Sequence, residues 1–196
     1  MAYNPNIHHR KSIRLKGYDY SKEGLYFITI CTQNREHLFG EITVGAGFSR
    51  PDTDTKIKLN NIGEIIENEF LNLIKKYQNI NLHEYIIMPN HFHCIIEIVS
   101  YSVGNNENTE KTWWENLEKT GRENPAPTIG NIIGYFKYQT TKIYNEIMDI
   151  KNDKFLKIWQ RNYYEHIIRN EETYLKISNY IINNPLNWKE DKYYES

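Results

Sequence analysis

The chain has 196 residues, of which 39% are hydrophobic and 25% are charged, and its formal net charge is −1. This composition is typical of a globular protein, and the length suits one domain with a hydrophobic core of its own. No run approaches the roughly 18 apolar residues that a membrane span needs, and the N-terminus lacks the apolar core of a signal peptide. We therefore expect a cytoplasmic protein with no membrane partner.

Residues 1–24 are predicted to form a basic arm. Between His8 and Lys22 the arm carries five lysines and arginines against one acid, interleaved with two tyrosines. Cations and aromatic rings at this density suit contacts with the phosphates and bases of DNA, and a solvated tail without a partner is the plainer alternative. The candidate DNA-binding residues of this arm are Arg10, Lys11, Arg14 and Lys16.

Seven elements are predicted after the arm, in the order strand, helix, strand, strand, helix, strand, helix. Strands are indicated by runs of aromatic and β-branched residues, and helices by apolar residues at helical spacing. Capping residues precede the helices, namely Asn60 or Asn61, Thr128 and Asn170, and Pro185 stops the last one. The elements span residues 25–34, 59–77, 81–88, 91–99, 128–147, 155–169 (a strand or a hairpin) and 170–188.

This order matches the split βαβ pattern of ferredoxin-like folds with an added C-terminal helix. The expected class is therefore α+β, an antiparallel sheet with helices packed on it. We predict a single domain over residues 25–188, with a turn-like stretch at 35–42, an exposed loop at 45–55 and a polar insert at about 100–127. Residues 189–196 are predicted to be a C-terminal tail. The two cysteines lie in apolar, strand-like runs and are expected to be reduced thiols.

Two histidines, His91 and His93, stand in the apolar strand predicted over 91–99. Side chains alternate along a strand, so both imidazoles project from one face, with their Cα atoms about 7 Å apart, while Phe92 and Cys94 point the other way. A single histidine here would more plainly be a hydrogen-bonded core residue. Two buried imidazoles on one face need a shared partner, and a metal ion is the natural one.

The segment MPNHFHCII resembles the His-hydrophobic-His motif of HUH single-strand endonucleases, in the form carried by single-tyrosine transposases of small insertion sequences. The later block WQRNYYEHIIRNEETYLKISNYIINNPLNW resembles, more narrowly, the REP-associated tyrosine transposases, which act on repeated extragenic palindromes. The similarity runs from about Tyr26 to Trp188 and leaves out the polar insert and the loop around Ser49. It implies a divalent metal, Mg²⁺ or Mn²⁺, and a tyrosine nucleophile on the C-terminal helix.

The chain has sixteen tyrosines, so composition does not identify the nucleophile. The family motif matches Tyr180, in the segment SNYIINNP. The alternative is Tyr135, which has Gln139 four residues further on in the second long helix.

Asn184 is the candidate third metal ligand beside His91 and His93. It lies four residues after Tyr180, so a continuous helix would present both side chains on one face. However, Asn184 precedes Pro185, which disfavours helical dihedral angles at the residue before it. If Asn184 caps the helix instead of continuing it, its role as a ligand is in question.

The resemblance implies a metal-dependent single-strand DNA endonuclease and strand transferase. It would act through a 5′-phosphotyrosine intermediate, on hairpin or palindromic DNA, as a monomer or a homodimer. Lys137, Arg161 and Arg169 are further candidates for contacts with the DNA backbone, with plain solvent-exposed charges as the alternative. Two other functions fit the sequence: a DNA-binding protein with the same fold but no cleavage activity, and a metal-dependent phosphodiesterase that uses water.

Overall fold

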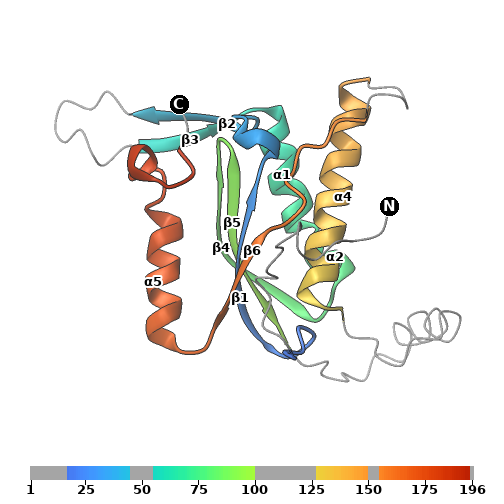
Figure 1. Cartoon of the computed structure of the whole chain (residues 1–196), viewed down its shortest axis with the longest axis vertical. Helices are drawn as coiled ribbons and strands as arrows, with labels where there is room; N and C mark the ends of the chain where they lie inside the picture. Colours follow the sequence, from blue (N-terminus) through green and yellow to red (C-terminus); the bar gives the residue numbers. More distant parts are fainter. Residues whose placement is uncertain (1–16, 45–54, 100–126, 150–154, 195–196) are drawn as a thin grey trace, which may run out of the picture.

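The computed structural model describes residues 17–44, 55–99, 127–149 and 155–194 (Figure 1). The four candidate DNA-binding residues of the arm and residues 100–126 of the polar insert lie outside these ranges. Among the described residues, none of the helices combines the length and the apolar character that crossing a bilayer requires.

The centre of the fold is a four-stranded antiparallel sheet with the strand order β4-β5-β1-β6. Its strands are β1 (Gly24–Cys31), β4 (Ile80–Met88), β5 (His91–Ile98) and β6 (Tyr164–Ile168). The chain passes from β1 through a helix to β4, and β5 then returns between them, which is the ferredoxin-like split βαβ connection. The predicted α+β class and antiparallel sheet are confirmed.

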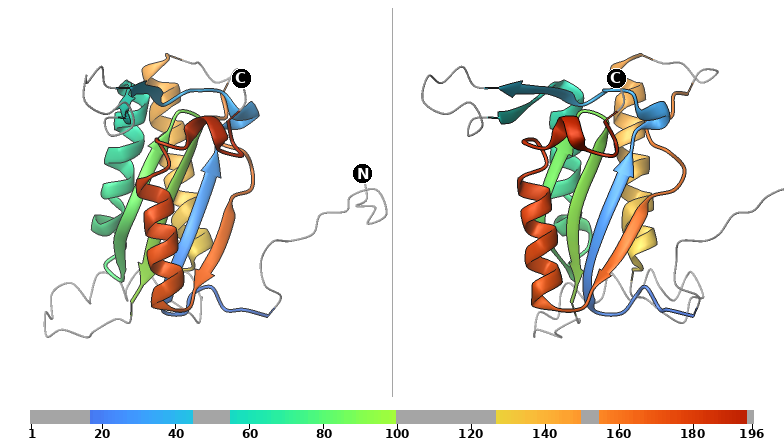
Figure 2. Two further views of the ribbon diagram at one scale, coloured as in Figure 1. Left: turned by 90° about the vertical axis from the view of Figure 1, so that its left-hand side faces the viewer. Right: turned by 60° about the vertical axis from the view of Figure 1, so that its left-hand side comes forward.

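Helices cover both faces of this sheet (Figure 2). On one face lie α1 (Asn61–Leu71), the short α2 (Leu73–Lys76) and α4 (Ile129–Ile147), and they enclose the larger hydrophobic core. On the other face lies α5 (Glu171–Ile182), over a smaller apolar cluster. One face of the sheet therefore packs in the main core, against α1 and α4, and the other face is covered by α5.

The side chains of Asn60, Thr128 and Asn170 cap α1, α4 and α5, as predicted. Each accepts hydrogen bonds from backbone N–H groups of the first turn, which have no partner inside the helix. Both cysteines are free thiols, as expected from the sequence.

Several segments differ from the prediction. The first strand ends at Cys31, before its predicted end at residue 34, and a short helix, η1 (Gln33–Arg35), follows it. The turn-like stretch predicted at 35–42 runs into a strand, β2 (Gly40–Val44), which pairs with β3 (Thr55–Leu59) in a separate two-stranded ladder. Gly40 has φ 153° and approaches the Lys58 backbone so closely that a Cβ atom would collide with it. The strand predicted over 155–169 is confined to β6, because the preceding residues form only one isolated bridge, from Trp159 to Thr32.

Candidate active site

His91 and His93 lie on the face of β5 that is covered by α5. In the sheet, His93 pairs with Thr29 and His91 with Cys31, whereas Phe92 points into the core on the opposite face. Both imidazoles are buried, with exposed fractions of 0% and 1%, and their ring centroids are 4.5 Å apart. The two rings therefore lie side by side at the end of the strand, as the alternation predicted.

Hydrogen bonds to their Nδ1 atoms orient both rings. The Asn90 side chain donates from Nδ2 to the Tyr193 carbonyl at 2.8 Å, so its Oδ1 is the atom that faces His91 Nδ1, at 2.9 Å. A carboxamide oxygen only accepts, so His91 carries its proton on Nδ1 and its Nε2 is a lone pair. His93 is also held at Nδ1, which lies 2.8 Å from the Thr29 hydroxyl, a group that can donate or accept. A hydrogen-bond partner on Nδ1, with Nε2 turned into the site, is typical of histidines that bind metals.

Tyr180 reaches this pair from α5. Its hydroxyl lies 3.2 Å from His93 Nε2 and donates to Asp191 Oδ2 at 3.3 Å. The residue is 39% exposed, although its hydroxyl contacts buried His93. Burial of the ring and the nearby negative charge of Asp191 raise the pKa of Tyr180, so the free phenol is protonated at neutral pH.

The alternative tyrosine, Tyr135, lies on the opposite side of the sheet. It belongs to α4, where its ring contacts Tyr77 at 6.0 Å between centroids and lies under the Lys76 ammonium at 4.4 Å. Of the two candidates, only Tyr180 is brought to the histidines.

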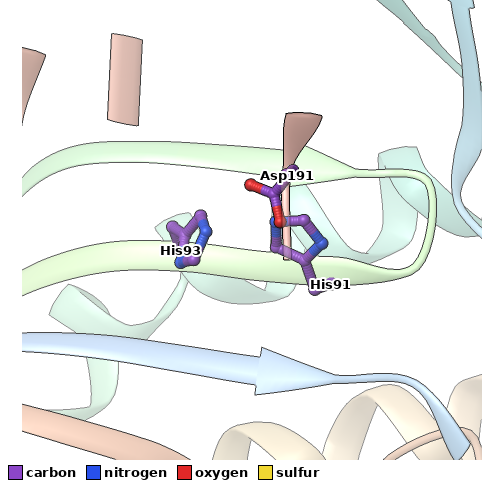
Figure 3. A group of neighbouring side chains, drawn as sticks. All are labelled: His91, His93 and Asp191. Carbon is purple, nitrogen blue, oxygen red and sulfur yellow. The ribbon is translucent and has the colours of Figure 1, made fainter. Parts of the chain in front are cut away.

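Asp191 completes the cluster, and sequence reasoning missed it. His91, His93 and Asp191 each offer a ligand atom, and these atoms all lie within 4.8 Å of one another (Figure 3). The segment predicted as a C-terminal tail instead turns back after α5 through a short helix, η3 (Trp188–Glu190), whose Trp188 is buried. No local sequence pattern identifies Asp191 as a site residue, because only this reversal of the chain brings it close to the histidines.

Asn184 lies just beyond the helix. α5 ends at Ile182 and Asn183 is its C-terminal cap, so Pro185 does interrupt the helix as the dihedral argument anticipated. The Asn184 side chain nevertheless points into the site, where it is 1% exposed and its Nδ2 donates to Asp191 Oδ2 at 2.9 Å. Tyr180 and Asn184 thus meet at the same carboxylate oxygen.

These groups fit a divalent metal ion. Among the described residues, His91 Nε2 and Asn184 Oδ1 are buried without a hydrogen-bond partner, and leaving such atoms unsatisfied is costly. A cation bound by both, together with His93 Nε2 or an Asp191 oxygen, would satisfy them. Mixed imidazole nitrogen and oxygen ligands suit Mn²⁺ and the later divalent metals and also tolerate Mg²⁺.

Burial keeps both imidazoles neutral, the form that binds metals. It lowers the pKa of His91 to about 4, against the opposing effects of nearby Asp191 and Asn184. The pKa of His93 also lies well below its usual value, mainly because the ring is buried and secondarily because of His91. At neutral pH each ring is therefore uncharged and keeps a lone pair on one of its nitrogens.

Two cations that the sequence did not single out lie near the cluster. Arg35 is in the left-handed region, with φ 57°, and donates from Nη1 to the Lys192 carbonyl at 3.3 Å. The Lys192 ammonium lies 4.7 Å from the centre of the Tyr193 ring, and that ring is 4.7 Å from the ring of His91. Both positive charges also disfavour protonation of His91.

Lys137, another predicted DNA contact, lies on α4, on the opposite face of the sheet from this cluster. Lys137 donates from Nζ to the backbone carbonyls of Gln160 and Arg161, at 2.6 and 3.0 Å, and burial lowers its pKa to about 8. This lysine therefore ties α4 to the segment that leads into β6. Arg161 and Arg169 are exposed, and their contacts with DNA remain predictions, as does that of Lys137.

No family model matches the chain. An uncharacterized protein from Haemophilus influenzae is 40% identical over 192 residues, which cover 98% of this chain and 97% of that protein. The solved structure of a REP-associated tyrosine transposase bound to a REP hairpin is 18% identical, with a TM-score of 0.47, over 91% of this chain and 76% of that one. A candidate transposase from Deinococcus radiodurans is 12% identical, with a TM-score of 0.42, over 87% of this chain and 95% of its own. Structural likeness at this level does not indicate a function for this chain.

Replacing His91 with alanine is expected to weaken Mn²⁺ binding by about 100-fold or more, since removal of a ligand costs more affinity than removal of an outer hydrogen bond. Calorimetric titration measures this affinity. His83→Ala is the matched control, because His83 faces α5 from β4 but bonds to Glu97. If the histidines were core residues only, His91→Ala would leave Mn²⁺ binding unchanged and cost about 2–4 kcal/mol of unfolding free energy.

The low pKa of His91 also predicts how the stability of the metal-free protein depends on pH. Between the ordinary value of 6.5 and about 4, an unfolded imidazole takes up a proton that the folded one does not. The unfolding free energy should therefore fall as the pH falls through this window, by up to about 1.4 kcal/mol per pH unit for this group. Urea denaturation in EDTA measures the unfolding free energy at each pH. For His91→Gln this free energy should depend less steeply on pH than for wild type, and equal pH dependence in both proteins would contradict the prediction.

Proposed function

The chain belongs to the same family as its relative from Haemophilus influenzae. We propose that it is a metal-dependent single-strand DNA endonuclease and strand transferase. It would act through a 5′-phosphotyrosine intermediate on Tyr180. The observation that carries this proposal is the position of the Tyr180 hydroxyl, 3.2 Å from His93 Nε2 and beside a cluster of nitrogen and oxygen donors suited to a metal. The His-hydrophobic-His motif and the tyrosine block of the sequence support it.

The site has the groups that phosphodiester cleavage needs. A divalent ion held by His91, His93 and an oxygen of Asn184 or Asp191 would supply a Lewis acid for a nonbridging phosphate oxygen. The Tyr180 oxygen attacks the phosphorus in line, and the bond to the 3′ oxygen of the preceding nucleotide breaks. The 3′ oxygen takes up a proton from solvent as it leaves, so the products are a 5′-phosphotyrosine and a free 3′-hydroxyl.

The proton of Tyr180 needs an acceptor, because the raised pKa of its phenol leaves it protonated before attack. Asp191 is placed for this role, since its Oδ2 already accepts from the hydroxyl at 3.3 Å. The same atom accepts from Asn184, and Oδ1 accepts from the Tyr193 backbone N–H at 2.7 Å, so the carboxylate is held in orientation. As Tyr180 becomes bonded to phosphorus, its proton passes to Asp191.

The reverse reaction joins strands. The phosphotyrosine bond conserves the energy of the cleaved phosphodiester, so another 3′-hydroxyl can attack it, lose its proton to solvent, re-form a phosphodiester and release Tyr180. Tyr180 then recovers a proton from Asp191, and no nucleotide cofactor is consumed. The proposed substrate, hairpin or palindromic DNA with a single-stranded flank, follows from the sequence motifs.

Tyr180→Phe is expected to abolish the covalent protein–DNA adduct while leaving the affinity for the same oligonucleotide within about twofold, because only the nucleophilic oxygen is removed. The adduct is measured on a denaturing gel with Mn²⁺ and a labelled hairpin that carries a single-stranded flank. Tyr135→Phe is the matched control and should still form it.

The gel and the affinity measurement together separate the alternatives. Cleavage without an adduct would indicate a phosphodiesterase that uses water, and binding without cleavage would indicate a DNA-binding protein. An adduct that survives Tyr180→Phe and disappears with Tyr135→Phe would overturn the assignment of the nucleophile.

The basic arm is expected to contribute affinity by neutralising DNA phosphates. Replacing Arg10, Lys11, Arg14, Lys16 and Lys22 with neutral residues should therefore reduce the slope of log K against log salt, by up to about 0.7 to 0.9 for each phosphate that is no longer neutralised. Fluorescence anisotropy across a salt series measures this slope. An unchanged slope would show that the arm is a solvated tail.

A further inference from the structure

A bulge in β4 turns two consecutive side chains towards α5. Leu82 pairs with Ile96 and Tyr85 pairs with Cys94, so two residues of β4, His83 and Glu84, stand opposite one residue of β5. Side chains normally alternate between faces, and an extra residue shifts this alternation by one. As a result His83 and Glu84 both face α5, where the Tyr174 hydroxyl lies 3.3 Å from His83 Nδ1 and 2.9 Å from Glu84 Oε2.

Glu84 binds two successive turns of the helix that carries Tyr180. Its carboxylate accepts from the Tyr174 hydroxyl at 2.9 and 3.2 Å and from the Ser178 hydroxyl at 3.1 Å. Tyr174 and Ser178 are four residues apart and therefore share a helix face, and Ser178 is two residues before Tyr180. One carboxylate thus fixes both the rotation of α5 and its position along the sheet.

The apolar contact under α5 is small. Ile181 is the only one of its large hydrophobic side chains that is fully buried, and the residues of this helix are all described. Leu175 and Ile182 are 51% and 60% exposed. Tyr174 and Ile177 are partly buried against the same cluster. Apolar burial is not directional, so polar contacts are needed to fix the register of the helix.

We infer that Glu84 is a positioning residue, which holds α5 in the register that places the Tyr180 hydroxyl at His93. The inference rests on the proposed function for its catalytic consequence. A shift of α5 by one residue moves its side chains by about 1.5 Å along the axis and about 100° around it, which takes the hydroxyl away from the metal ligands. In-line attack tolerates much less than this, and a displacement of about 1 Å can cost roughly 100-fold in rate.

Glu97 offers a matched control. It lies on β5, on the same face as His93, and its carboxylate accepts from Asn81 Nδ2 at 2.9 Å and lies 3.1 Å from His83 Nε2. It belongs to the same polar network, but these partners are both on β4, so removing it takes away a carboxylate without releasing the helix.

The test compares Glu84→Ala and Glu97→Ala in single-turnover cleavage of the labelled hairpin with Mn²⁺. Glu84→Ala should lower the cleavage rate by about 10- to 100-fold, with affinities for DNA and Mn²⁺ within about twofold of wild type. Glu97→Ala should stay within about threefold of the wild-type rate. Equal rates for Glu84→Ala and wild type, or equal decreases in both variants, would overturn the inference while leaving the proposed function intact.

Hydrogen exchange tests the same inference without catalysis. Glu84→Ala should speed exchange of the α5 backbone amides by about tenfold or more relative to those of β5, and Glu97→Ala should not. If wild type does not cleave DNA, the proposed function fails, and this measurement alone decides whether Glu84 holds the helix. Should Glu84→Ala not fold, the pair Tyr174→Phe and Ser178→Ala removes the same hydrogen bonds from the helix side and must give the same pattern. Unchanged α5 exchange in both sets overturns the inference.

Discussion

The candidate site depends on the alternation of side chains along β5, because both faces of this strand are covered. Phe92 and Cys94 pack into the core under α1 and α4, and His91 and His93 are turned towards α5. The apolar residues of one face stabilise the strand, so the other face can carry buried polar groups without loss of the fold. The residues that stabilise the strand and the residues of the candidate site thus lie on opposite faces of the same strand.

The cost of burying imidazoles explains the rest of the arrangement. Asn90 and Thr29 engage the Nδ1 atoms and burial keeps the rings neutral, so both Nε2 atoms are directed into the site, that of His91 as a lone pair. An unsatisfied lone pair in a buried position destabilises a protein unless something binds it. Nε2 of His91 and Oδ1 of Asn184 are buried without a hydrogen-bond partner among the described residues, so both destabilise the metal-free fold. A metal ion is the partner that best accounts for both.

The segment from Asn170 to Asp191 supplies the oxygen-bearing side chains of the candidate site, those of Tyr180, Asn184 and Asp191. α5 begins at its Asn170 cap, delivers Tyr180 and ends before Pro185, and the chain then reverses so that Asp191 accepts hydrogen bonds from both Tyr180 and Asn184. A proline that ends the helix therefore does not remove Asn184 from the site. It creates the turn that allows a carboxylate to come back to the tyrosine.

Local patterns in the sequence determined the helices and the strands of the main sheet, the caps, the ferredoxin-like order, and the shared face of His91 and His93, but not the β2–β3 ladder. These features depend on neighbours a few residues apart, which a periodicity or a capping residue reveals. Only the tertiary structure decided that Asp191 joins the histidines, that Tyr180 and not Tyr135 lies on their side of the sheet, and that β4 carries a bulge at Glu84. Each of these depends on residues that are far apart in the sequence or on different strands, which meet through the packing of α5 and the returning chain against the sheet, and no local pattern encodes them.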